Sequence, residues 1–395
     1  MKTCVIDIET SVNNVGEDAV GDEKGSPFCP MNTIELIGVY QDEQYREYVP
    51  QQMGSDAWMF NADMLIGHNI RFDLMYLLKT YPWFEEWLHD PEHYIWDTQL
   101  AEYLLTGHTS QWASLDDVSV KYGGTLKDDR IKKMWDDGVK TEDIPAELLS
   151  SYLKHDVMNT HLVFQAQMKE ARKLNMFPLL KSQFHALKAT LEMWKNGLRF
   201  DKEMAIVAIE ETYEVKERLE KEIKDVFAST HPKLPREKIE AGSNDMLSRT
   251  LFGGRYVYRG DEPLYDDDGK PVVYKSGKQK GLHKTKRVDK EDVIMPWFAA
   301  DPKWETKKAG IYSVGDDVIS SLQPQSKEQE EVLSLIKEFR GVCKDLDTYF
   351  TGYSALAWPE NDMWFIHGSL NHCATGTGRL SSSRPNLQNM SAKVR

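Results

Sequence analysis

The chain has 395 residues, of which 41% are hydrophobic and 28% charged. This composition predicts folded domains, and the length suffices for two or three of them. No apolar run is long enough to span a bilayer, and Asp7 and Glu9 interrupt the N-terminal apolar stretch, which argues against a secretory signal. The four cysteines lack CxxC spacing, which argues against disulfides and a zinc site. We therefore expect a cytoplasmic protein with no membrane partner.

The formal net charge of −14 argues weakly against a nucleic-acid partner, because neutralising phosphates usually requires a basic surface. The total charge does not determine the electrostatic potential at a particular site, however. Acids that bind metal ions add to the negative total, but the bound ions reverse the charge at the site itself. Residues 270–287 also contain seven lysines and arginines and no acid. A local basic surface is therefore expected in this segment.

The first part of the chain predicts an α/β domain that ends near residue 175. Strands are expected at residues 2–9, 34–40, 44–49 and 64–68, with a loop over 13–33. Helices are expected after Asn69, from Asp97, after a capping Ser114 and over 144–171, where Pro145 stands at the start.

The second part predicts a mostly helical region with a β-hairpin insert. Helices are expected within 176–240 and 325–350, a hairpin-rich insert over 255–312, and strands around a glycine-rich turn over 364–383.

Acids from separate segments of the first part form an ordered set. Asp7 and Glu9 alternate on one predicted strand, so their side chains face the same side. Asp73 follows some sixty residues later, and Asp156 lies one helical turn after Tyr152, on the same helical face. Mg²⁺ or Mn²⁺ prefers oxygen ligands, and two such ions roughly 3.5–4 Å apart suit phosphodiester hydrolysis. Any single acid among 63 is more often a solvated surface residue, so the ordered set carries the interpretation.

The segments VIDIET, GHNIRFD and YLKHD resemble the three motifs of the DnaQ-like (RNase H-like) 3′→5′ exonuclease superfamily. The third is similar to the tyrosine subtype (DEDDy), whereas the histidine subtype would need histidine where this chain has Ser151. The resemblance implies a catalytic set of Asp7, Glu9, Asp73, Tyr152 and Asp156, in which the four acids bind two divalent ions, Mg²⁺ or Mn²⁺, and the tyrosine orients water.

The same resemblance implies a site for the unpaired 3′ end of DNA. Asn69 and Phe72 match positions that hold this end, and Thr10 matches one that contacts the terminal nucleotide through its backbone. Asp97 begins a segment typical of the superfamily, but a structural role at a helix start is at least as well supported.

The segment ATGTGRLSSSRPNLQNM, residues 374–390, resembles a long signature of family A DNA polymerases. Residues 196–201, 243–254 and 338–352 resemble further segments of that family. The resemblances imply an exonuclease domain at 1–175 and, at 176–395, the thumb and first part of the palm. With a lysine-rich insert, this arrangement looks like bacteriophage versions of the family, which would place the protein in the cytoplasm of an infected bacterium.

Primer–template DNA is the expected partner of the second part. Arg379 can reach minor-groove acceptors that all correct base pairs share. The side-chain amides of Asn386, Gln388 and Asn389 can donate to sugars and base edges without preference for a particular base sequence. Lys284, Lys286 and Arg287 are expected to contact the duplex backbone. The alternatives are a plain turn at Gly376–Gly378 and a solvated hairpin.

The palm and fingers motifs that follow the LQN segment in family A polymerases do not occur after Met390. We therefore expect no nucleotide addition by this chain alone, and a second polypeptide carrying the rest of the palm and fingers is a possible partner. The leading hypothesis is a proofreading exonuclease with a primer–template-binding part. The alternatives are a non-catalytic DNA-binding subunit of a split polymerase and an RNA-processing exonuclease, which the polymerase signature disfavours.

Overall fold

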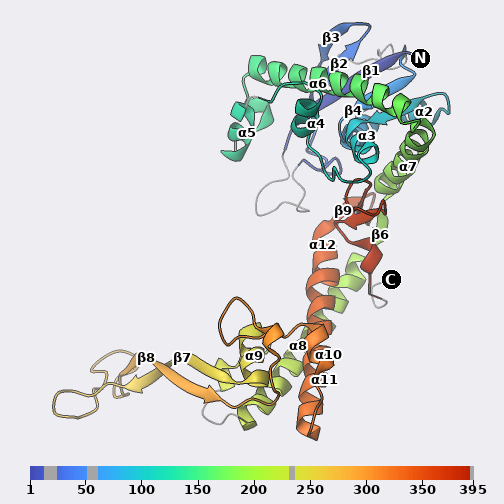
Figure 1. The fold of residues 1–395 in the computed structure, drawn as a ribbon. Coiled ribbons are helices and arrows are strands. Elements are labelled where there is room, and N and C mark those ends of the chain that lie inside the picture. The colour runs from blue at the N-terminus through green and yellow to red at the C-terminus, as the bar shows by residue number, and fades with distance from the viewer. Residues whose placement is uncertain (13–24, 51–60, 128, 231–235, 392–395) are drawn as a thin grey trace. The chain divides into compact units, whose positions relative to one another are not determined.

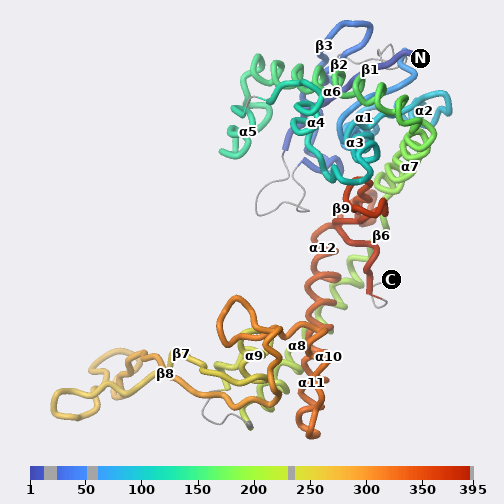
Figure 2. Tube along the Cα trace, viewed as in Figure 1, coloured from blue at the N-terminus to red at the C-terminus, as the bar shows by residue number. Residues whose placement is uncertain are grey.

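The computed structural model describes residues 1–12, 25–50, 61–127, 129–230 and 236–391. Their contacts define two compact units, residues 1–205 with 351–395, and residues 206–350. Figures 1 and 2 trace the chain from a blue N-terminus to a red C-terminus. Among the described residues, no helix has both the length and the apolar character needed to cross a membrane.

The first unit is built on a mixed sheet, which confirms the predicted α/β class. The strands are β1 (Thr3–Thr10), β2 (Ile34–Gln41), β3 (Gln44–Tyr48), β4 (Met64–Gly67) and β5 (Tyr94–Asp97). The five strands lie in the order β3-β2-β1-β4-β5, and β1 pairs antiparallel with β2 but parallel with β4. The four predicted strands are confirmed. The sequence does not predict β5, because three apolar or aromatic residues followed by Asp97, directly before a helix start, carry no alternation.

Helices flank this sheet. They are α1 (Arg71–Thr80), α2 (Phe84–His89), α3 (Thr98–Leu105), α4 (Leu115–Lys121), α5 (Asp129–Asp136), α6 (Ala146–Lys173) and α7 (Phe177–Asn196). The predicted cap of α4 is confirmed, since Ser114 Oγ accepts from the Asp117 N–H and the Asp117 carboxylate accepts from the Ser114 N–H. Pro145 immediately precedes α6, as predicted.

The long helix α6 lies across one face of the sheet (Figure 1) and packs against β1 and β2. Gly38 on β2 makes this close approach possible, because a Cβ atom there would lie 2.7 Å from Cγ of Leu153 on α6. A side chain at this position would push the helix away from the strand that carries Asp7 and Glu9.

Helix α7 belongs by its packing to the first unit. Leu180, Phe184, Leu187 and Leu191 are buried in the same core as the strands of the main sheet. The contacts between residues therefore place the end of the first stretch of this unit at Ala205. The sequence motifs predict a domain boundary at residue 175.

The C-terminal residues 351–395 complete the first unit as far as residue 391. They contain α12 (Gly352–Leu356), β9 (Ala357–Glu360), β10 (Met363–Ile366), β11 (Ser369–Asn371), β12 (Ser381–Ser383) and the short turn η7 (Leu387–Asn389). β10 lies between β9 and β6 (Leu198–Phe200), and β11 pairs with β12. The predicted strands around the glycine-rich turn are thus confirmed.

The second unit is a helical body with one long hairpin. Its helices and turns are most of α8 (Lys202–Thr230), η4 (Arg236–Lys238), α9 (Asn244–Phe252), η5 (Pro302–Trp304), α10 (Asp316–Ser321), α11 (Lys327–Lys344) and the π-helical turn η6 (Asp345–Thr351). The hairpin is β7 (Gly254–Pro263) with β8 (Thr285–Ile294), which confirms the predicted insert over these residues. Residues 13–24 of the predicted loop lie outside the described residues. So do residues 231–235 of the predicted helical stretch.

Candidate active site

Three of the predicted catalytic acids lie together. Asp7 and Glu9 point from β1, and Asp156 points from α6, which packs on that strand. One carboxylate oxygen of each lies within 4.8 Å of one from the other two. Glu9 and Asp156 are buried and Asp7 is partly buried. Residues separated by about 150 positions therefore form one carboxylate cluster.

Asp73, the fourth predicted acid, lies beside this cluster. Its Oδ1 accepts a hydrogen bond from the backbone N–H of Ile8, at 3.1 Å, between the two acids of β1. Burial raises the pKa of Asp73, and the nearby Asp7 raises it further. The structure thus brings all four acids to one edge of β1, with three of them in direct proximity.

The electrostatics of the cluster fit a hard divalent cation. Burial raises the pKa of Asp7, and repulsion from Asp156 adds to the shift. Burial likewise raises the pKa of Glu9, with Asp7 as the next cause. Asp156 Oδ1 is buried and accepts no hydrogen bond from the described residues. Buried, like-charged oxygens with an unsatisfied acceptor match the ligand set that Mg²⁺ or Mn²⁺ prefers.

Lys127 is a residue of this site that the sequence does not predict. Its Nζ lies 2.5 Å from Asp156 Oδ2 and 3.3 Å from the Tyr152 hydroxyl. Burial opposes the charge of Lys127, but Asp156 and neighbouring groups outweigh it and raise the lysine pKa above its ordinary value. A single lysine between motifs carries no spacing signal, so only the packing of its loop against α6 reveals it.

Tyr152 lies where the helical spacing predicts, one turn before Asp156. Its ring stands edge-on to Trp135 with centroids 5.6 Å apart, and Lys127 Nζ lies 4.8 Å from the Tyr152 ring centroid. Burial raises the pKa of Tyr152 to about 12. The phenol is therefore neutral at physiological pH and can donate a hydrogen bond.

The residues predicted to hold a 3′ end flank the acids. Asn69 is exposed just ahead of α1 in a left-handed conformation, φ 53°, and Phe72 is half-buried on the first turn of that helix. Thr10 follows an irregularity in the β1–β2 register directly after Glu9. Such irregularities are frequent next to active sites.

Asp97 has the structural role that the sequence left open. Its Oδ1 accepts from the N–H groups of Gln99 and Leu100, which caps α3. The same oxygen accepts from the N–H of Asn69 at 3.0 Å. Asp97 therefore fixes the backbone of a predicted 3′-end contact.

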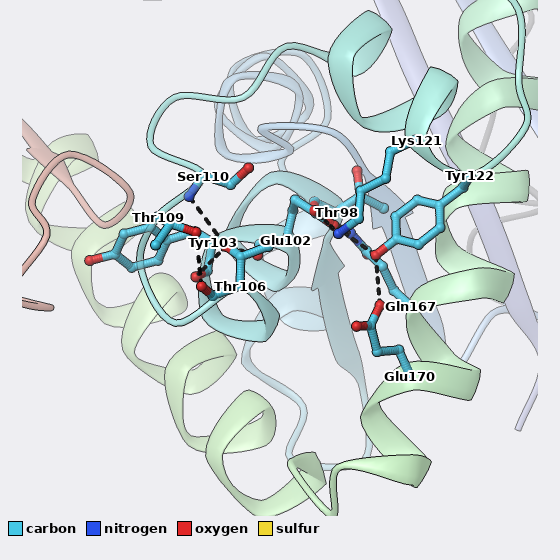
Figure 3. A network of polar contacts seen from close by, with 10 residues as sticks. All are labelled: Thr98, Glu102, Tyr103, Thr106, Thr109, Ser110, Lys121, Tyr122, Gln167 and Glu170. Atoms are coloured by element: carbon cyan, nitrogen blue, oxygen red, sulfur yellow. Dashed lines mark hydrogen bonds and ion pairs between the residues drawn. The ribbon is translucent and has the colours of Figure 1, made fainter.

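A buried polar network joins α3 to α4 and to α6 (Figure 3). Glu102 on α3 is 1% exposed and accepts from Lys121 at 2.6 Å. The Tyr122 hydroxyl lies 2.9 Å from a carboxylate oxygen of both Glu102 and Glu170, and Gln167 donates to Glu102 at 3.2 Å. The network holds α6, and with it Tyr152 and Asp156, against the rest of the unit.

Replacing Glu102 by alanine is expected to destabilise the first unit by about 1–3 kcal/mol, because the buried Gln167 amide and the half-buried Tyr122 hydroxyl each lose one acceptor and Lys121 loses its ion-pair partner. Denaturant unfolding of the variant measures this loss. The matched control is Glu142→Ala, an exposed acid 3.6 Å from Lys140, for which less than about 1 kcal/mol is expected. Equal losses in both variants would contradict a stabilising role for the network.

The predicted duplex-binding residues lie in both units. Arg379 is exposed after the turn at Gly378, and Asn386 and Asn389 are exposed nearby. The Gln388 side-chain amide donates to the Leu380 carbonyl at 2.9 Å, so part of its predicted donor capacity is used within the protein. In the second unit, the hairpin carries the remaining basic residues: Lys286 and Arg287 are exposed, and Lys284 is half-buried over the ring of Tyr274.

The C-terminal part of the chain is similar to known proteins. Residues 292–395 match the family described as DNA polymerase family A. This segment, here named the polymerase segment, is therefore similar to DNA polymerase family A over about a quarter of the chain. Family A DNA polymerases use divalent metal ions, usually Mg²⁺. The polymerase segment includes Arg379, Asn386, Gln388 and Asn389.

Individual polymerases are also similar to this chain, over short stretches. The chain is 35% identical over 90 residues to the thermostable DNA polymerase I of Thermus thermophilus, covering 23% of this chain and 10% of that protein. It is 28% identical over 134 residues to DNA polymerase I of Bacillus subtilis (strain 168), covering 34% of this chain and 13% of that protein. The matches thus span only about a tenth of the length of these curated relatives.

The fold has a solved counterpart. The structure described as the POL domain of Pol1 from M. smegmatis, in complex with DNA primer-template and dNTP, is similar with a TM-score of 0.58. The likeness covers 92% of this chain and 50% of that chain at 16% identity. At this identity the comparison concerns the fold alone.

Proposed function

We propose that residues 1–175 form a divalent-metal-dependent 3′→5′ exonuclease acting on DNA, joined to a polymerase segment that binds primer–template. The observation that carries the proposal is the convergence of Asp7, Glu9 and Asp156 within 4.8 Å, with Asp73 beside them. When bound, divalent ions supply an activated water and stabilise the leaving oxygen.

The side chains of the cluster take distinct roles in this proposal. Asp7, Glu9 and Asp156 would hold the ions, and Asp73, bonded to the Ile8 N–H, keeps a fourth carboxylate at the same edge. Tyr152, as a neutral phenol, would orient the attacking water by hydrogen bonding. Lys127 holds Asp156 in place and offsets part of the cluster's negative charge.

The proposal is tested by incubating a 5′-labelled primer, annealed to a template, with the protein and Mg²⁺. A ladder of primers shortened one nucleotide at a time is expected, and EDTA should abolish it. A label released in one step, or no shortening at any Mg²⁺ concentration, would contradict the exonuclease. A matched RNA primer reports whether the nuclease distinguishes DNA from RNA.

Replacing Tyr152 by phenylalanine is expected to lower kcat of primer shortening by roughly 10–10²-fold, because a positioned hydrogen bond to the reacting water is lost while the ring stays. Single-turnover kinetics measure this loss. Tyr45→Phe removes a hydroxyl on β3 of the main sheet, one that donates to Glu47, and is the control expected to keep the parent rate. An unchanged rate in Tyr152→Phe would remove the tyrosine from the mechanism.

A second candidate function is a non-catalytic DNA-binding chain that completes a polymerase with a second polypeptide. The match of the polymerase segment to family A favours it, since that match covers 292–395 and not the carboxylate cluster. Primer–template binding with no shortening in Mg²⁺, together with primer extension when a chain supplying the remaining palm and fingers is added, would favour this candidate.

A further inference from the structure

Arg71 lies in the middle of the segment that carries the predicted 3′-end contacts, yet its side chain bonds elsewhere. Nη2 donates to Ser369 Oγ at 2.6 Å, and Nη1 donates to the Leu370 carbonyl. The guanidinium also stacks 5.0 Å from the ring centroid of Trp194 on α7. Ser369 and Leu370 belong to β11, within the polymerase segment.

Residues 369–378, here named the docking segment, make further contacts to the same region. The Tyr103 hydroxyl on α3 donates to the Thr375 carbonyl at 2.6 Å, and the Trp112 N–H donates to the Cys373 carbonyl at 3.3 Å. At Gly378, with φ 74°, a Cβ atom would lie 2.8 Å from the His108 ring. In Figures 1 and 2 the red C-terminal chain accordingly runs beside the lower ends of α3 and α7.

Two of the helices that the docking segment contacts, α1 and α3, meet at the predicted substrate site. The Asp97 carboxylate caps α3 and at the same time accepts the N–H of Asn69, the residue that precedes α1 in a left-handed conformation. Asparagine tolerates this conformation better than most residues, and the bond from its N–H to Asp97 fixes it here. Asp73, two residues after Arg71, bonds to the N–H of Ile8.

We propose that the docking segment of the polymerase part positions the exonuclease site, and that Arg71 is the positioning residue that transmits its placement to Asn69 and Asp73. This inference rests on the proposed exonuclease. The bidentate geometry requires a guanidinium, because Arg71 reaches a hydroxyl and a carbonyl on successive residues of β11. β11 pairs with β12, which directly follows Arg379 and Leu380. Duplex bound at Arg379 would therefore act on the hairpin that holds α1.

The test compares Arg71→Met with Arg71→Lys and with Arg172→Met, an exposed arginine at the end of α6 that serves as the charge-matched control. Substitution of groups that orient ligands typically costs 10–100-fold in activity. For Arg71→Met we expect kcat on a single-stranded DNA oligonucleotide to fall by about 10–100-fold and KM to rise. Arg71→Lys should be intermediate, and Arg172→Met should match the parent protein. Adding Ser369→Ala to Arg71→Met should cause little further loss, since both changes remove one contact.

Hydrogen exchange of the amides of residues 65–75 supplies a readout that does not depend on activity. Arg71→Met should accelerate their exchange without changing exchange in the main-sheet strands β1 and β2. Parent-like exchange and kinetics in Arg71→Met would overturn the positioning role. An inactive parent would overturn the proposed exonuclease, and the exchange measurement would then decide the role of Arg71 by itself.

Discussion

The Asp7→Asn/Glu9→Gln variant is expected to lose at least about 10³-fold in 3′→5′ exonuclease activity, since removing even one preorganised hydrogen-bond donor from an active site costs about 10²–10³-fold and this variant removes two charged metal ligands. The two substitutions keep size and shape while removing two of the three negative charges that lie within 4.8 Å. Without them the cluster loses its affinity for divalent cations. Primer shortening in Mg²⁺ measures the loss.

Two controls separate this effect from a general one. Glu86→Gln/Glu92→Gln makes the same change in net charge at exposed positions of the first unit and should shorten primers as the parent does. Primer–template binding by the Asp7→Asn/Glu9→Gln variant, measured by fluorescence anisotropy, should equal that of the parent. A rate of primer shortening within 10-fold of the parent rate would show that the cluster is not the nuclease site. Such a loss is well below the roughly 10²–10³-fold cost of removing one preorganised contact.

The same double variant is expected to stabilise the metal-free protein at pH 8. Burial raises the pKa of Asp7 and of Glu9, so the folded state binds their protons more tightly than the unfolded state. Their contribution to stability is therefore fully present below the unfolded pKa values, near 4, and is lost as pH rises through the folded values. The neutral amides escape this loss. A gain of about 1 kcal/mol would raise the unfolding temperature by about 2–4 °C in a unit of this size.

Calorimetry in EDTA across pH 4–8 tests this expectation. The unfolding temperatures of parent and variant should converge toward pH 4 and separate toward pH 8. Addition of Mg²⁺ at pH 8 should raise the unfolding temperature of the parent and leave that of the variant unchanged, because only the parent retains the ligands. A variant less stable than the parent in EDTA at pH 8 would refute the account of the cluster as mutually repelling carboxylates.

Local spacing was sufficient to predict much of the fold and the composition of the site. Alternation on a strand places Asp7 and Glu9 on one face, and four-residue spacing on a helix places Tyr152 and Asp156 together. Capping chemistry located the start of α4 at Ser114. These features depend on interactions within a few residues along the chain. They can therefore be predicted without knowing which distant residues pack against them.

The tertiary structure decided the features that depend on contacts between distant residues. The approach of α6 to β2 at Gly38, the ion pair of Lys127 with Asp156 and the bonding of Arg71 to β11 join residues 29 to 299 positions apart. The assignment of α7 to the core of the first unit belongs to the same class. Such contacts are selected by packing and charge complementarity in three dimensions. A single sequence therefore determines the acids and their helices and strands, while the partners that hold them in place emerge only when the chain is folded.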